Sequence, residues 1–330
     1  MFVSVRLRRR SGALVLGLTL VLGLLLPVLG RGWAQAAQEK RDFIKWVDFD
    51  VPASVLQAAL DFDTASHAGE ETPLSWVDLL AYLAAKYGGD FSRYRPTDME
   101  KAAEMVKSGE DLAQLPSFPY YQEAYGAVLG GFVGEYRLEG EEGFESRYGL
   151  RAYSPIAETF PYSDYDDFGA SREYGYRRRH LGHDMMAAVG TPVIAVESGV
   201  VENLGWNQYG GWRVGIRSRD GQRYWYYAHL RRGHPFAAGI TEGAEVEAGQ
   251  VIGYVGMTGY STTPDTNGMS APHLHFGLQL IFDESQKEGS DEIWVDVYHL
   301  VNLLERRRST VVPGEEKGEY QRKYQLVPLE

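Results

Sequence analysis

APHLHFGLQL, the stretch from Ala271 to Leu280, is an apolar run with the character of a β-strand, and it carries two histidines two positions apart. Successive side chains of a strand point to opposite faces, so the imidazoles of His273 and His275 share one face and look into the same space. A pair of aligned imidazoles indicates a metal site only if other ligand-type residues accompany it. The chain supplies such residues in two other places.

Two further segments carry side chains of the ligand type, HLGHD beginning at His180 and YYAHL ending just after His229. A catalytic zinc takes three protein ligands and keeps a fourth position open. His180 and Asp184 offer an imidazole and a carboxylate from one loop, in which a glycine lets the backbone turn tightly. Together with His275 from the strand, they make a complete set of three ligands.

The remaining histidines of these segments, His229 and His273, are predicted at strand ends that face the same groove. A neutral imidazole can accept a proton or donate a hydrogen bond to a developing oxyanion, so both suit proton transfer. His183 is an alternative metal ligand, because it lies beside Asp184. The other histidines, interpreted as ordinary surface or core residues, are His67, His234 and His299.

The chain has 330 residues, no cysteine and a formal net charge of −12. Its length allows one or two domains with an ample core. Because there is no cysteine, disulfides and thiolate zinc sites are excluded, and any zinc must be held by histidine and carboxylate. The acidic balance argues against nucleic acid or anionic lipid as a partner.

The first 36 residues have the pattern of an export signal. Arginines at 6 and 8–10 precede an apolar run from Ala13 to Leu29, and Ala34-Gln35-Ala36 follows as a cleavage site of small residues. We therefore predict a secreted or envelope-associated protein. An uncleaved anchor is the alternative, since residues 13–29 are near the lower length limit for a spanning helix. No other membrane contact is expected.

Residues 40–134 show apolar side chains at helical spacing, with no charged cluster that stands out as catalytic. Helices are predicted over 50–60, from Ser75 to the Gly88-Gly89 pair, and from Thr97 or Asp98 to Ser108. We interpret this part of the chain as a helical accessory region.

From Arg177 onward the pattern changes to short β-runs separated by turn signals, and Asp220-Gly221 between two such runs predicts a hairpin. The predicted fold class is an all-β antiparallel catalytic domain, a sheet sandwich or partly open barrel with a groove, preceded by a mainly α-helical region. One amphipathic helix is predicted over Glu292 to Arg308.

The domain boundaries follow from shifts in composition. Glycines and glutamates dominate EYRLEGEEGFESRYG, which starts at Glu135, and this indicates a flexible boundary. The expected segments are a signal peptide or anchor at 1–36, a helical accessory region at 37–134, a linker at 135–152, the catalytic domain at 153–308, and a polar, mobile tail at 309–330.

A loop rich in tyrosine and aspartate lies near the start of the catalytic domain. Its acids, Asp164, Asp166 and Asp167, do not have the spacing of a known calcium-binding loop. We interpret them as solvated loop acids.

Three separated motifs, HLGHD, YAHL and PHLHF, occur in this order with TPVIAVESGVV and GQVIGYVGMTG between them. Over residues 168–304 the chain thereby resembles the lysostaphin-like (LytM-type) zinc metallopeptidases, which cut peptidoglycan peptides. The resemblance implies one zinc ion held by His180, Asp184 and His275. It also implies that His229 and His273 form the catalytic pair.

Two features depart from the pattern of that family. The segment from Tyr260 to Ala271 is longer than the usual link before the H-x-H motif, so we expect a remodelled groove rim and an altered substrate choice. Gly277 stands where many members have an acid. Neither departure touches a proposed ligand.

The sequence thus predicts an exported zinc metalloendopeptidase that hydrolyses peptide bonds in peptidoglycan stem peptides or cross-bridges. The alternative is a non-catalytic scaffold of the cell envelope, which binds peptidoglycan or activates a partner hydrolase. The complete set of ligand-type residues counts against this alternative.

Overall fold

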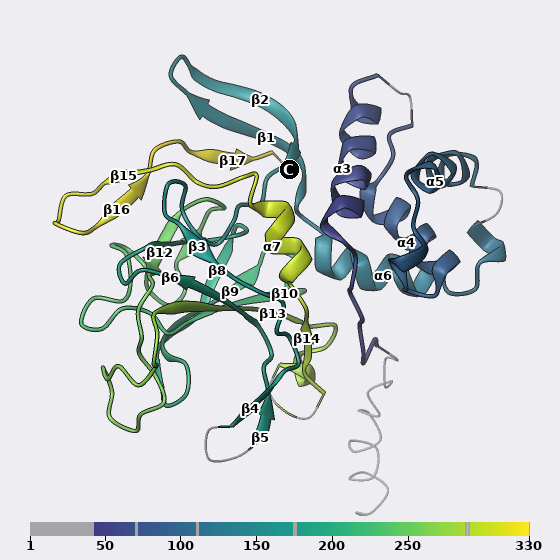
Figure 1. Cartoon of the computed structure of the whole chain (residues 1–330). Helices are drawn as coiled ribbons and strands as arrows, with labels where there is room; N and C mark the ends of the chain where they lie inside the picture. Colours follow the sequence, from purple (N-terminus) through teal and green to yellow (C-terminus); the bar gives the residue numbers. More distant parts are fainter. Residues whose placement is uncertain are drawn as a thin grey trace, which may run out of the picture. The chain divides into compact units, whose positions relative to one another are not determined.

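Helices α3 to α6 precede the strands in the computed structural model, which describes residues 43–69, 72–109, 112–173, 177–287, 289 and 291–329 (Figure 1). The apolar run at 13–29 lies outside these residues, so the predicted export signal remains a prediction. Within the described ranges, no helix combines the length and apolar character that a membrane crossing requires.

The helices predicted in the N-terminal region are confirmed. Gly88 and Gly109 end α4 and α5 in the left-handed conformation, with φ of 69° and 67°, which costs glycine little. Short 3₁₀ turns at Phe91–Arg93 and Leu112–Gln114 connect the helices. The four helices are α3 (Ala53–His67), α4 (Trp76–Tyr87), α5 (Pro96–Ser108) and α6 (Phe118–Leu129).

The segment predicted as a flexible linker is instead a β-hairpin, formed by β1 (Val133–Gly140) and β2 (Gly143–Leu150). Strand β17 (Leu326–Pro328), from the segment predicted as a mobile tail, pairs with β1. Both predictions were wrong. They rested on the many charged residues of these segments and overlooked the few apolar residues that become buried. Tyr136 and Leu326 are buried, while the preceding residues, Glu135 and Gln325, are exposed.

The main sheet is antiparallel throughout, with the strand order β11-β8-β9-β10-β13-β6-β3 and with β14 paired to β13. The described strands close no barrel, and the predicted fold class and the hairpin at Asp220-Gly221 are confirmed. The strands are β3 (Tyr162–Ser163), β6 (His183–Ala187), β8 (Gly199–Asn207), β9 (Gly211–Ser218), β10 (Arg223–Ala228), β11 (Glu245–Val246), β13 (His273–Leu280) and β14 (Ile293–Val295).

The predicted helix over Glu292–Arg308 was only partly right. Ile293 and Val295 pair with the edge of β13 as strand β14, and the helix α7 spans only Tyr298–Leu304. The small sheets pair β4 (Ser171–Glu173) with β5 (Arg177–Arg179), β7 (Pro192–Ile194) with β12 (Val251–Tyr254), and β15 (Val311–Pro313) with β16 (Tyr320–Arg322).

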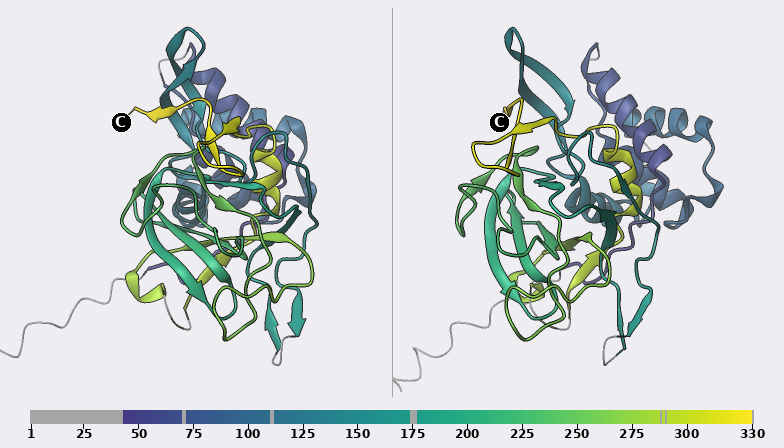
Figure 2. Two further views of the ribbon diagram at one scale, coloured as in Figure 1. Left: turned by 90° about the vertical axis from the view of Figure 1, so that its left-hand side faces the viewer. Right: turned by 60° about the vertical axis from the view of Figure 1, so that its left-hand side comes forward.

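An aromatic column joins the helices to the sheet. Trp76 of α4 lies 6.5 Å from Phe132, Phe132 lies 5.9 Å from Trp225 of β10, and Trp225 lies 5.5 Å from Phe276 of β13, each measured between ring centroids. Buried side chains of the helices and of the sheet belong to one hydrophobic cluster. The helical region therefore packs against the sheet instead of forming a core of its own (Figure 2).

A buried ion pair lies beside this column. Arg223 Nε and Nη2 each lie 2.9 Å from an oxygen of Glu197, and Trp225 Nε1 donates to the same carboxylate at 2.9 Å. Arg223 Nη1 donates to the carbonyl of Ala127 in α6, also at 2.9 Å. The guanidinium thus ties α6 to strand β10.

Replacing Arg223 with methionine is expected to lower the free energy of unfolding by about 3–5 kcal/mol, because the Glu197 carboxylate would stay buried without its partner. Urea unfolding measures this loss. Arg147→Met is the matched control: its ion pair with Glu145 is exposed, so a change within about 0.5 kcal/mol is expected. Equal effects of the two substitutions would contradict the role given to Arg223.

Candidate metal centre

Two neighbouring strands bring the predicted metal ligands together. Asp184 on β6 and His275 on β13 stand directly opposite each other in the antiparallel register, and His180 precedes β6. His180 Nε2 lies 3.1 Å from Asp184 Oδ1 and 3.0 Å from His275 Nδ1. His275 Nδ1 in turn lies 3.0 Å from Asp184 Oδ1. Two nitrogens and one oxygen thus converge on one point.

Gly182 makes this convergence possible, but not through a tight turn as the sequence suggested. Its φ is not in the positive region. A Cβ at this position would lie 2.6 Å from Cε1 of the His275 ring, closer than any real contact. The glycine is therefore required because the His275 ring passes directly over the backbone between the other two ligand-type residues.

The charge states of these groups fit a metal ion. Burial alone would raise the pKa of Asp184, but hydrogen bonds and charge from His180 and His275 hold it well below its ordinary value. Burial lowers the pKa of His275, against the opposing effect of Asp184, and so favours the neutral ring. Metal ligands must be deprotonated. The separations of 3.0–3.1 Å are also near the ~3.3 Å edge of a tetrahedron with zinc-like bond lengths.

Asp167 and Arg172 contact this group, although nothing in the sequence indicated that either residue belongs to the site. Asp167 Oδ1 lies 3.1 Å from His180 Nδ1, and Arg172 forms ion pairs with both Asp167 and Asp184. Asp167 is only 7% exposed, so its interpretation as a solvated loop acid was wrong. The Asp167 carboxylate thus faces the second ring nitrogen of His180 as a close contact without hydrogen-bond geometry, in the place where an acid commonly orients a ligating ring.

His183, the alternative ligand, points away from the group. Along β6 it alternates with Asp184, and its Nε2 lies 2.7 Å from the Asp164 carboxylate. Asp164, too, is therefore paired instead of solvated, and Asp166 is the exposed acid of the three. The histidines interpreted as ordinary pair with acids elsewhere in the fold: His67 with Asp63, His234 with Glu319, and His299 with Asp50.

His229 and His273 lie side by side next to the three ligand-type residues, with ring centroids 4.8 Å apart. His229 Nδ1 is 2.8 Å from the carbonyl of Thr258, and His273 Nδ1 is 2.9 Å from the carbonyl of Ala271. A carbonyl only accepts, so the neutral form of either ring has its proton on Nδ1 and leaves Nε2 free to accept another. His273 Nε2 lies 3.8 Å from Asp184 Oδ1.

The surroundings of His229 keep its ring neutral and fixed. Burial lowers its pKa well below the ordinary value, and the charges of His273 and His275 lower it further. Its backbone is left-handed, with φ of 59°, a strain of about 1–3 kcal/mol for a residue with a side chain. Tyr260 stacks on the ring at 5.9 Å.

The long segment from Tyr260 to Ala271 forms part of the rim beside this site. Tyr260 covers His229, and Asp265 accepts a hydrogen bond from Trp212 Nε1 at 2.8 Å, which anchors the segment to β9. The other departure, Gly277, lies under Trp294: a Cβ there would be 2.9 Å from the indole ring.

A groove of about 460 Å³ opens from these histidines across strands β9, β10 and β13. Its outer part is formed mainly by basic and aromatic side chains. The lining residues beyond His180, His229 and His275 include Arg178, Arg179, Arg213, Tyr209, Tyr224, Tyr226, Gln279, Lys287, Glu292 and Trp294.

Known proteins match the same part of the chain. Residues 178–288 match the family model described as Peptidase family M23. The L-Ala–D-Glu endopeptidase of Bacillus subtilis is 40% identical over 188 residues, which are 52% of this chain and 56% of that protein. Lysostaphin of Staphylococcus simulans is 41% identical over 98 residues, which are 29% of this chain and 17% of that protein.

A crystal structure of a LytM-type protein from Ruminococcus gnavus is similar at the level of the fold, with a TM-score of 0.52 and 26% identity. The similarity covers 77% of this chain and 88% of that structure. The chain spans about half the length of the Bacillus subtilis relative and less of lysostaphin. The residues of the His-Asp-His group thus lie in a domain that matches the model of peptidase family M23.

Proposed function

We propose that this protein is an exported zinc metalloendopeptidase that hydrolyses peptide bonds in peptidoglycan stem peptides or cross-bridges. The observation that carries the proposal is the convergence of His180, Asp184 and His275 at the end of a groove, with His229 and His273 beside them. The similarity to an L-Ala–D-Glu endopeptidase and to lysostaphin supports peptidoglycan as the substrate.

His180, Asp184 and His275 would hold the zinc ion, one per chain. When bound there, zinc supplies a Lewis acid that polarises the scissile carbonyl and makes water more acidic. Asp167 and Arg172 would hold the His180 ring and the Asp184 carboxylate in position, because they contact the sides of these groups that face away from the centre.

His229 and His273 would carry the proton transfers. Each offers Nε2 as an acceptor, since Nδ1 donates to a backbone carbonyl. One ring would take the proton of the attacking water and later give it to the leaving amine. The other would then stabilise the negative charge that develops on the carbonyl oxygen. The carbonyls of Thr258 and Ala271 keep both rings in the tautomer that this requires.

The pattern of residues 1–36 supports export, and the acidic balance of the chain supports a partner other than nucleic acid. Expression of the whole chain in a bacterial host, with the mature N-terminus determined from the extracytoplasmic fraction, tests export. Recovery of uncleaved protein from the cytoplasm would contradict it.

Removal of zinc is expected to abolish activity. The purified protein should release new free amino groups from purified peptidoglycan, release should fall to background with a zinc chelator, and added zinc should restore it. Mass analysis of the fragments then identifies the bond. Chelator-resistant release would contradict the metal mechanism. Zinc binding without any release would favour the non-catalytic scaffold.

A further inference from the structure

Arg213 shares one face of the main sheet with the proposed metal ligand on β13. His275 pairs with Ala228, and two residues along β10 Tyr226 pairs with Gly215 of β9. Paired residues, and residues two apart on a strand, point to the same side. Arg213 lies two residues from Gly215, so its side chain rises on the face of His275, and it lines the groove.

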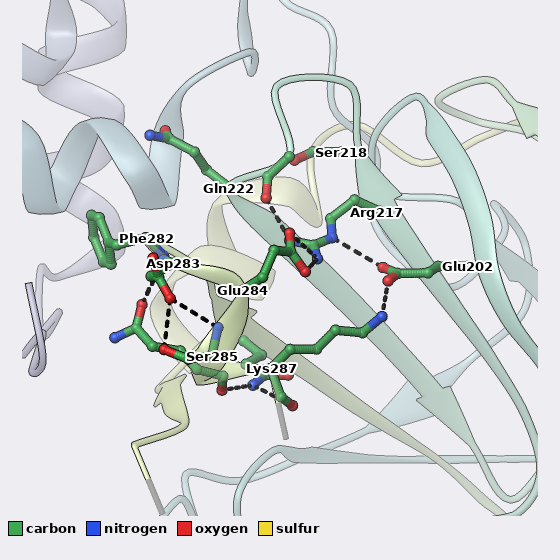
Figure 3. A network of polar contacts seen from close by, with 12 residues as sticks. Glu202, Arg217, Ser218, Gln222, Phe282, Asp283, Glu284, Ser285 and Lys287 are labelled. Carbon is green, nitrogen blue, oxygen red and sulfur yellow. Dashed lines mark hydrogen bonds and ion pairs between the residues drawn. The ribbon is translucent and has the colours of Figure 1, made fainter. Parts of the chain in front are cut away.

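Two other basic side chains near Arg213 are already paired with acids. Arg217, four residues along β9, lies between Glu202 and Glu284, with nitrogen–oxygen distances of 3.0 Å to each (Figure 3). Lys287, which lines the groove with Arg213, forms an ion pair with the same Glu202 (Figure 3). The positive charge at this end of the groove is therefore largely neutralised by the protein itself.

Arg213 differs from these two residues. Among the described residues, no acid forms an ion pair with Arg213, and its Nε is buried without a hydrogen-bond acceptor. The carboxylate that lines the groove, Glu292, accepts instead from Trp294 Nε1 at 2.8 Å. A half-buried guanidinium without an acid is costly unless a ligand supplies the opposite charge.

Two tyrosines line the groove beside Arg213. Tyr224 lies flat against β9, where Gly215 leaves room for its hydroxyl, and that hydroxyl donates to Asn203 Oδ1 at 2.8 Å. Tyr226 passes over Gly210 in the same way. Gly215 of β9 and Gly210 of the β8–β9 turn thus leave room for these two rings, which line the groove together with Arg213.

We propose that Arg213 binds a carboxylate of the substrate, so that the groove selects acidic stem peptides over glycine cross-bridges. This inference rests on the proposed function and names its substrate class. A D-Glu residue linked through one of its carboxyl groups keeps the other as a free carboxylate, whereas a glycine chain has none. The planar guanidinium can hold such a group through two parallel hydrogen bonds.

Two peptides that differ in one group test the inference: N-acetyl-L-Ala–D-Glu–L-Ala amide, linked through the Glu γ-carboxyl, and its counterpart with a carboxamide in place of the free carboxylate. Equilibrium binding is measured with metal-stripped protein, so that no turnover occurs. We expect the protein to bind the acid about tenfold or more tightly than the amide, and Arg213→Gln to bind both equally.

Arg217→Gln is the matched control, because it removes a positive charge from the same strand and face but one that Glu202 and Glu284 already neutralise. It should keep the preference for the acid. Arg213→Lys, which keeps the charge but loses the planar fork, should retain part of the preference and serves if Arg213→Gln does not fold.

Equal binding of the two peptides by the unaltered protein, a preserved preference in Arg213→Gln, or no binding of either peptide would each overturn the inference. Cleavage is measured separately with zinc-loaded protein and whole peptidoglycan. A protein that prefers the acid but cuts nothing would refute the proposed hydrolase and leave the carboxylate site standing. A protein that cuts peptidoglycan without this preference would refute the carboxylate site and leave the proposed hydrolase standing.

Discussion

Asp184→Ala is expected to lose zinc and hydrolysis together. Oδ1 of this carboxylate lies within 3.1 Å of both His180 Nε2 and His275 Nδ1, and Oδ2 lies 3.1 Å from Arg172. Its loss removes one of three ligands and leaves the arginine facing two imidazoles. Because the metal supplies several kcal/mol of transition-state stabilisation, release of amino groups should fall at least about a thousandfold.

Zinc content and release of amino groups are measured on the same preparation. Asp166→Ala is the matched control, because Asp166 is an exposed acid of the neighbouring loop and should keep both properties. An Asp184→Ala protein that still binds one zinc ion per chain would show that the carboxylate is not a ligand.

His273→Ala is expected to separate chemistry from metal binding. Its Nδ1 lies 2.9 Å from the carbonyl of Ala271, and its Nε2 lies beside the His-Asp-His group, 3.8 Å from Asp184 Oδ1. Loss of one proton-transfer group lowers turnover by about 10²–10⁴-fold, while the three ligands remain. His229→Ala should behave in the same way.

The measurements are the rate of hydrolysis, the zinc content and the function in cells. His234→Ala serves as the control, because His234 is half exposed and pairs with Glu319 outside the groove. Loss of zinc from His273→Ala would assign His273 to the ligands instead. Full function of His273→Ala in cells would favour the scaffold.

The geometry that could be predicted from the sequence is local. His273 and His275 are two positions apart in a strand, so their shared face follows from strand periodicity alone. The hairpin at Asp220-Gly221 follows from turn chemistry between alternating runs. The three separated motifs then brought His180, Asp184 and His229 into the same prediction, and the structure places all of these side chains around one point.

Contacts between distant segments could not be predicted in this way. Asp166 and Asp167 are adjacent acids in the same stretch of sequence, yet Asp167 is buried against His180 and Asp166 is exposed. Strand β1 finds its partner β17 almost two hundred residues later, and only Tyr136 and Leu326 are buried on these strands. Arg213 lies in none of the sequence motifs, so its role could not be predicted from them. Its surroundings arise from the registers of three strands.

The aromatic column of Trp76, Phe132, Trp225 and Phe276 determines how this protein could be recombined with others. Phe276 follows His275 in the chain, so the column ends directly behind the His-Asp-His group. The composition of residues 135–152 suggests a domain boundary. A chimera joined there would separate Trp76 and Phe132 from Trp225 and Phe276. A fragment for transfer to another protein must instead begin before α3 and include all four aromatic residues.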